Sequence, residues 1–114
     1  MANAFDVLGD PVRRRILELL ADGELSSGEI TTTVRLEFGI SQPAVSQHLR
    51  VLRESGFTSV QPRGACRLYS IRSAPFREME EWMGTFRSFA EQRLDSLETE
   101  LARGKRESRL KGES

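Results

Sequence analysis

Hydrophobic residues recur every three or four positions through most of the first 55 residues, as they do on one face of an α-helix. The pattern predicts four helices, over residues 2–9, 11–22, 26–36 and 42–55. Asp10 followed by Pro11 is a typical helix start, and Ser26 with Glu29 three residues later forms a capping box. The first half of the chain is therefore predicted to be helical.

After Gly56 the period of the hydrophobic pattern changes to two, which is typical of β-strands. Residues 57–62 and 66–72 are predicted strands, and residues 63–65 (Arg-Gly-Ala) form the turn between them. The sequence therefore predicts a two-stranded hairpin directly after the fourth helix.

A long amphipathic helix is predicted over residues 75–103. Its apolar positions follow a nearly regular heptad seam: Phe76, Met79, Met83, Phe86, Ala90, Leu94, Leu97 and Leu101. At 1.5 Å per residue it would be about 43 Å long, too long for one small domain to cover. A second copy of the chain is the simplest partner, and the alternative is that the helix folds back over its own core. Residues 104–114 are predicted to be a charged flexible tail, which leaves residues 1–103 as one domain.

The fourth helix carries an unusual polar face. Val45, Leu49 and Leu52 form its apolar stripe, and most other positions hold amides, hydroxyls, an imidazole or arginine. Solvated helix faces usually carry Glu and Lys, whereas short hydrogen-bonding groups followed by arginines suit the DNA major groove. The alternative is a surface helix that is merely rich in Ser and Gln.

Two helices joined by a tight turn and followed by a hairpin predict a mainly α fold with a small β-hairpin, the winged helix-turn-helix. The net charge is zero, but residues 41–72 carry five arginines and one acidic residue, a net charge of +4. A local positive patch is what binds phosphates, since salt screens charges beyond about 8 Å. Double-stranded DNA is therefore the expected partner, although the hairpin could also serve only to close the core.

Composition excludes several classes of protein. No apolar run in the 114 residues approaches a membrane span, so a cytoplasmic protein is expected. A metal site needs about four suitable ligands, and the chain has one cysteine and one histidine, so neither a metal nor another cofactor is expected. No credible nucleophile–base pair is present, which argues against an enzyme. Cys66 is either a half-buried strand residue or an oxidation switch promoted by neighbouring arginines.

Four parts of the sequence together resemble the ArsR family of bacterial winged-helix repressors. They are residues 5–17, the run Ser-Gln-Pro-Ala-Val-Ser-Gln-His-Leu at residues 41–49, the hairpin and the long last helix. The resemblance implies a homodimer, built from the first and last helices, that binds an operator and blocks transcription. The residues it places at the DNA are Ser41, Gln42, Pro43, Ala44, Ser46, Gln47, His48 and Arg50, with Arg63 and Arg67 on the wing. Those expected at the dimer interface are Phe5, Leu8, Met83, Phe86, Ala90, Leu94 and Leu97.

The chain departs from this family pattern in two ways. The third helix lacks the cysteine pair of metal-sensing members and the last helix has no His or Cys, which indicates the metal-independent branch. Twelve residues separate Glu29 from Ser41 where about eight are expected, so residues 32–38 either lengthen the third helix or bulge its loop. The predicted function is a homodimeric repressor, or autorepressor, that does not sense metal. The alternatives are a protein-interaction module, and a sensor that binds an unknown small organic effector near Trp82, Phe86 and Phe89.

Overall fold

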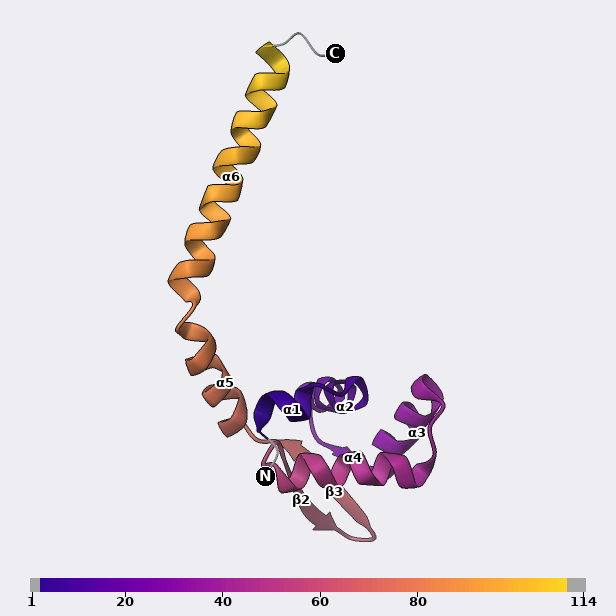
Figure 1. Cartoon of the computed structure of the whole chain (residues 1–114). Helices are drawn as coiled ribbons and strands as arrows, with labels where there is room; N and C mark the ends of the chain where they lie inside the picture. Colours follow the sequence, from indigo (N-terminus) through magenta and orange to yellow (C-terminus); the bar gives the residue numbers. More distant parts are fainter. Residues whose placement is uncertain (1–2, 111–114) are drawn as a thin grey trace. The chain divides into compact units, whose positions relative to one another are not determined.

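The computed structural model describes the backbone of residues 3–110 and the side chains of residues 3–95 and 97–101. The elements are α1 (Ala4–Leu8), α2 (Pro11–Ala21), β1 (Leu25–Ser26), α3 (Ser27–Phe38), α4 (Gln42–Glu54), β2 (Thr58–Arg63), β3 (Cys66–Ile71), α5 (Ala74–Gly84) and α6 (Arg87–Leu110) (Figure 1). The chain forms two compact units, a first unit through Met79 and a second unit from Glu80 onward. This mostly helical chain with a small antiparallel sheet confirms the predicted fold class.

Side-chain caps start the helices where the sequence predicts. Asp10 accepts the backbone N–H groups of Val12 and Arg13 at 2.8 and 3.2 Å, which satisfies two free donors in the first turn of α2, where Pro11 has no N–H. Ser26 and Glu29 form the complete capping box of α3. The turn into α4 passes through Gly39, whose φ of 67° is left-handed and favours glycine. These local signals fix the order and limits of the first four helices.

The sheet has three antiparallel strands in the order β1-β3-β2. Arg63 lies opposite Cys66, so the hairpin turn consists of two residues, and Gly64 takes a φ of 61° in it. The predicted hairpin is confirmed, whereas β1 was not predicted. β1 is only two residues long, too short to show a period in the sequence, and it pairs Leu25 with Tyr69.

The core of the first unit lies between α1–α4 and the hairpin. The apolar stripe of α4 (Val45, Leu49 and Leu52) is buried, as the sequence predicts. The other buried apolar residues are Val7, Val12, Ile16, Leu17, Leu20, Ile30, Val34, Phe57 and Tyr69. Because the inner face of α4 is packed in this way, its opposite face is held at the surface.

The predicted single helix over residues 75–103 is wrong, because the structure has two helices there. The chain leaves α5 after Gly84, and the N–H groups of Thr85 and Phe86 donate to the carbonyls of Trp82 and Met83 at 3.1 and 3.0 Å. These are i→i−3 bonds of a tight turn, and α6 begins at Arg87. Glycine followed by β-branched threonine is a weak helical pair, which makes this the natural place for a break.

The break divides the predicted heptad seam. Phe76 and Met79 pack against the core of the first unit, and the ring of Phe76 meets that of Phe57 edge to face at 5.3 Å. For Phe76 and Met79, the structure agrees with the alternative expectation, in which the last helix packs over the core of its own chain. The second unit instead exposes its large apolar side chains: Trp82, Met83, Phe86, Phe89, Leu94, Leu97 and Leu101. Of the predicted tail, residues 104–110 have helical backbone within α6, and residues 111–114 lie outside the described residues.

The additional residues before Ser41 lengthen α3, which continues to Phe38 without a bulge. Glu37 near its end accepts two hydrogen bonds from the guanidinium of Arg15 on α2, at 2.8 and 3.0 Å. The hydrogen bonds to Arg15 lower the pKa of Glu37, and those to Glu37 raise the pKa of Arg15. This bidentate pair attaches the extended end of α3 to α2.

Glu37→Gln is expected to lower stability near pH 7 more than at low pH. A carboxyl whose pKa is lowered by folding stabilises the native state above its ordinary pKa of 4.5, and that contribution is lost as the pH falls through the lowered value. Urea unfolding of both proteins at pH 7 and pH 3 tests this. Glu18→Gln is the control, because Glu18 lies 3.7 Å from Arg15 without the bidentate geometry. If Glu37→Gln lowers the free energy of unfolding by the same amount at pH 7 and pH 3, this prediction is contradicted.

Candidate nucleic-acid interface

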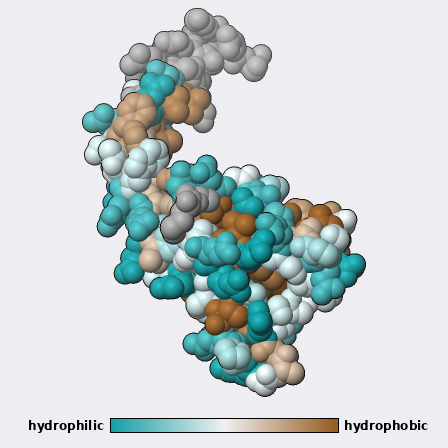
Figure 2. Space-filling model, turned by 60° about the horizontal axis from the view of Figure 1, so that its bottom comes forward, coloured by the Kyte–Doolittle hydropathy of each residue, from teal (hydrophilic) through white to brown (hydrophobic). Residues whose placement is uncertain are grey.

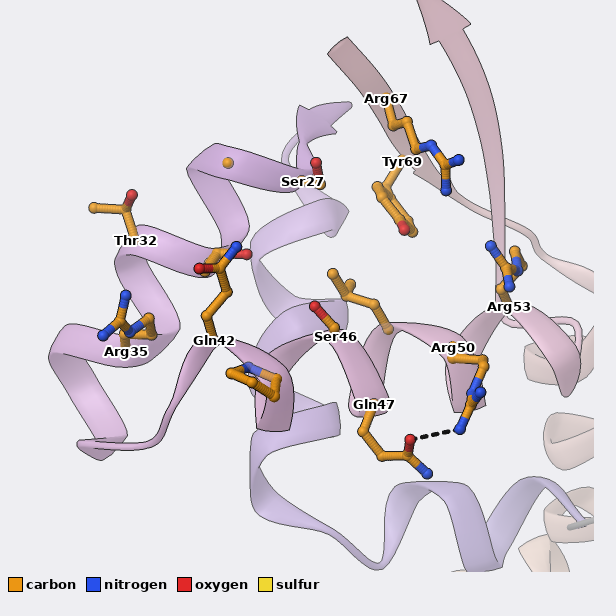
Figure 3. Close-up of a pocket in the computed structure, with 14 residues that line it drawn as sticks. Ser27, Thr32, Arg35, Gln42, Ser46, Gln47, Arg50, Arg53, Arg67 and Tyr69 are labelled. Atoms are coloured by element: carbon orange, nitrogen blue, oxygen red, sulfur yellow. Dashed lines mark hydrogen bonds between the residues drawn. The ribbon is translucent and has the colours of Figure 1, made fainter.

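An open groove of about 730 Å³ lies between α3, α4 and β3 (Figure 3). α4 forms one side of it, α3 the second, and β3 of the hairpin the third. Its uncharged polar lining consists of Ser27, Thr31, Thr32, Gln42, Ser46, Gln47 and Tyr69. The groove thus combines the exposed face of α4 with groups from two other elements.

Four arginines surround the groove and none of its lining residues is acidic. Arg50 and Arg53 come from α4, Arg35 from α3 and Arg67 from β3. Guanidinium groups bind phosphates with two parallel hydrogen bonds, so this arrangement is suited to an anionic polymer. Arg35 and Arg53 were not among the predicted contacts. Arg53 follows the predicted contact Arg50 by three positions, the helical spacing that could have indicated it, whereas no predicted contact on α3 could have indicated Arg35.

The structure brings six of the ten predicted DNA-contacting residues together along the groove: Gln42, Pro43, Ser46, Gln47, Arg50 and Arg67. Ser41 is exposed, and its hydroxyl caps α4 by accepting the N–H of Ala44 at 3.3 Å. Arg63 is exposed at the end of β2, beside the hairpin turn, and does not line the groove. These residues present polar groups on the surface of the first unit.

The two glutamines of α4 differ in their hydrogen bonding. The side-chain oxygen of Gln47 accepts a 2.7 Å hydrogen bond from Arg50 Nη2, one turn later (Figure 3). The amide NH₂ of Gln47 remains available to donate. Within the described part of the chain no group hydrogen-bonds the amide of Gln42, so this amide keeps both its donor and its acceptor.

His48 does not line the groove, unlike the other polar residues of α4. Its side chain is 19% exposed, and Nδ1 lies 3.4 Å from Arg13 Nη1 and 4.0 Å from Asp10 Oδ1. The placement differs from the expectation that His48 faces DNA, and the reason is helical geometry. His48 follows Val45 by three positions, so it lies next to the buried stripe and faces α2.

Across the described residues no group of three or more His, Cys, Asp or Glu side chains is placed to hold a metal ion. Cys66 is exposed at the start of β3, and among the helices described none is both long and apolar enough to cross a membrane. Hydrophilic side chains predominate on the visible face of the first unit, with hydrophobic ones in small separate patches (Figure 2).

A helix-turn-helix with an exposed polar second helix, a following hairpin and an arginine-lined groove defines a winged-helix DNA-binding protein. Comparison with known proteins agrees. The model of bacterial regulatory proteins of the arsR family matches residues 10–60. The transcriptional repressor SdpR of Bacillus subtilis is 34% identical over 86 residues, which cover 75% of this chain and 91% of SdpR. The biofilm growth-associated repressor of Xylella fastidiosa is 41% identical over 61 residues, 54% of this chain and 50% of that protein.

Solved structures extend the similarity to the fold. A crystal structure of an ArsR family transcriptional regulator superposes with a TM-score of 0.65 at 27% identity, covering 77% of this chain and 87% of that one. The repressor BigR of Xylella fastidiosa gives a TM-score of 0.55 at 32% identity, covering 74% and 82%. The chain therefore belongs to the ArsR family of bacterial regulatory proteins. Its class is that of DNA-binding transcriptional repressors and not of enzymes.

Proposed function

We propose that this protein is a homodimeric repressor, acting on its own promoter among its targets, that binds a two-fold operator through α4 and the hairpin. The observation that carries the proposal is the groove with four arginines and no acidic lining residue beside the exposed amides of α4. In this proposal Gln42, Ser46 and Gln47 read base edges. Arg50, Arg63 and Arg67 contact phosphates, which supply affinity but no sequence information. We expect it to act in the cytoplasm, at the nucleoid.

The proposed homodimer is supported by the apolar side chains of the second unit. Leu94, Leu97 and Leu101 are 47–66% exposed along α6 at heptad spacing, a pattern that needs a partner helix. Of the other predicted interface residues, Met83, Phe86, Ala90 and Phe5 are exposed, and Leu8 is half-buried against the core. A two-fold dimer would present two recognition helices to successive major grooves, about 34 Å apart.

We also propose that this repressor does not sense metal. A structural zinc site uses about four Cys or His ligands, or carboxylates in their place. His48 is engaged with Arg13 and Asp10 on α2, and Cys66 lies on the hairpin. With the only histidine and the only cysteine on separate elements, the chain supplies no pair of soft ligands.

Gln42→Ala is expected to weaken binding to the selected operator by about 1–3 kcal/mol and to relax its sequence preference, because a free amide can bond both N6 and N7 of adenine in the major groove. Arg63→Ala is the matched comparison, since a lost phosphate contact weakens all sequences alike and lowers the salt slope by about one. Fluorescence anisotropy on DNA selected from a random pool, at several salt concentrations, measures both. Failure of the wild type to bind any DNA would overturn the proposal and favour a protein-interaction module.

A further inference from the structure

We propose that the hydroxyl of Tyr69, Arg67 and the N-terminus of α3 together form a seat for one phosphate of the DNA backbone. The inference rests on the proposed DNA-binding function and adds to the phosphate contact of Arg67 two further groups, the Tyr69 hydroxyl and the start of α3. It concerns the part of the groove where β3 passes the start of α3 (Figure 3).

Tyr69 is the first observation. The residue is 5% exposed, and its ring reaches from β3 toward α4 with the hydroxyl pointing into the groove (Figure 3). The side chain is nearly buried as a whole, but its hydroxyl faces the groove and makes no hydrogen bond with any group in the described part of the chain. A donor held in a rigid, nearly buried position and aimed into an open groove is available to a ligand.

The start of α3 is the second observation. Ser27 and Gly28 are its first two residues and both line the groove. The Ser26 hydroxyl already accepts the N–H of Glu29 at 3.1 Å, whereas N–H groups in the first turn of a helix have no acceptor within the helix. Gly28 adds no side chain that would cover this backbone. The end of a 12-residue helix also carries partial positive charge, which favours an anion.

Arg67 completes the seat. It stands two positions before Tyr69 on β3, so the two side chains leave the strand on the same face, and both line the groove. A guanidinium, a phenolic hydroxyl and a helix N-terminus share one preference, which is an oxyanion. The seat lies in the same groove as Gln42 and Ser46, so a phosphodiester bound here would set the register of α4 on the bases.

Tyr69→Phe removes only the hydroxyl and is expected to weaken DNA binding about tenfold, by a similar factor on every sequence, because a hydrogen bond to a charged group is lost. Thr58→Val is the control: it removes another hydroxyl of the hairpin that has no partner, but this hydroxyl is buried and lies outside the groove, so DNA affinity should be unchanged.

The decisive experiment replaces single phosphates of the selected operator with neutral methylphosphonates. The penalty of Tyr69→Phe should disappear at one phosphate in each half-site and persist at all others. Equal binding by wild type and Tyr69→Phe, or a penalty that persists at every methylphosphonate, overturns the seat while leaving the proposed DNA-binding function intact.

Wild-type protein that binds no DNA would instead overturn the proposed function. In that case the seat is tested by measuring the thermal unfolding of wild type and Tyr69→Phe at increasing concentrations of inorganic pyrophosphate. Stabilisation of wild type but not of Tyr69→Phe supports a phosphoryl seat filled by a free ligand, and equal behaviour of the two proteins overturns it.

Discussion

The double substitution Leu94→Glu and Leu97→Glu is expected to make the protein monomeric and to weaken operator binding by about a hundredfold or more. Both side chains are exposed on one face of α6, 60% and 47% respectively, and a dimer would bury them. Burying unpaired carboxylates costs more free energy than a helix pair can supply. In a dimer, binding of one subunit to its half-site raises the effective concentration of the other subunit at the second half-site, which increases the affinity by a factor of about 10²–10⁴. A monomer binds a single half-site and loses this gain.

Sedimentation measures the mass, and anisotropy on a full operator measures the affinity. Gln92→Glu with Thr99→Glu is the matched control, because these exposed positions lie on the opposite face of the same helix and add the same charge. A dimer that survives the leucine substitutions would show that copies associate through another surface.

Phe57→Ala is expected to lower the free energy of unfolding by about 3–5 kcal/mol. Phe57 is fully buried where α4 ends and the hairpin begins, and its ring contacts Phe76 of α5 edge to face. Its backbone N–H donates to Leu52 and its carbonyl accepts from Arg72, both at 2.9 Å, so neighbouring segments cannot easily collapse into the cavity. The hairpin should therefore loosen together with the core.

Urea unfolding followed by circular dichroism gives this difference. Leu36→Ala provides the comparison, since Leu36 is 82% exposed and such surface changes usually stay within about 0.5 kcal/mol. A loss below 1 kcal/mol for Phe57→Ala would contradict the packing described for this residue.

The first four helices and the hairpin could be predicted because their signals are local. A capping residue such as Ser26 acts on an N–H three positions away, and the turn glycines act on their own φ angles. The break between α5 and α6 could not be predicted in this way. A glycine costs a helix only about 1 kcal/mol, so a heptad pattern that continues past Gly84 outweighs it in a sequence argument.

The groove likewise has features that could be predicted from the sequence and features that could not. The polar face of α4 is visible in the sequence, and the structure presents Gln42, Ser46 and Gln47 on one surface. The contributions of Arg35 and Tyr69 depend on how α3 and β3 meet α4, which no single segment specifies. His48 was predicted to face DNA from its chemistry, whereas its position beside the apolar stripe of α4 favours the contact with Arg13 that the structure shows.

The hydrogen bond between Arg50 and Gln47 bears on how degenerate the operator should be. Because its oxygen already accepts from Arg50, the amide of Gln47 presents its NH₂ donors to DNA more readily than its acceptor. Adenine and guanine both present the N7 acceptor in the major groove, so a donor there recognises a purine without distinguishing between the two. We expect either purine at the operator position that faces Gln47. The amide of Gln42 has both its donor and its acceptor free, so it can select adenine alone. One intramolecular bond would thus make neighbouring operator positions differ in stringency.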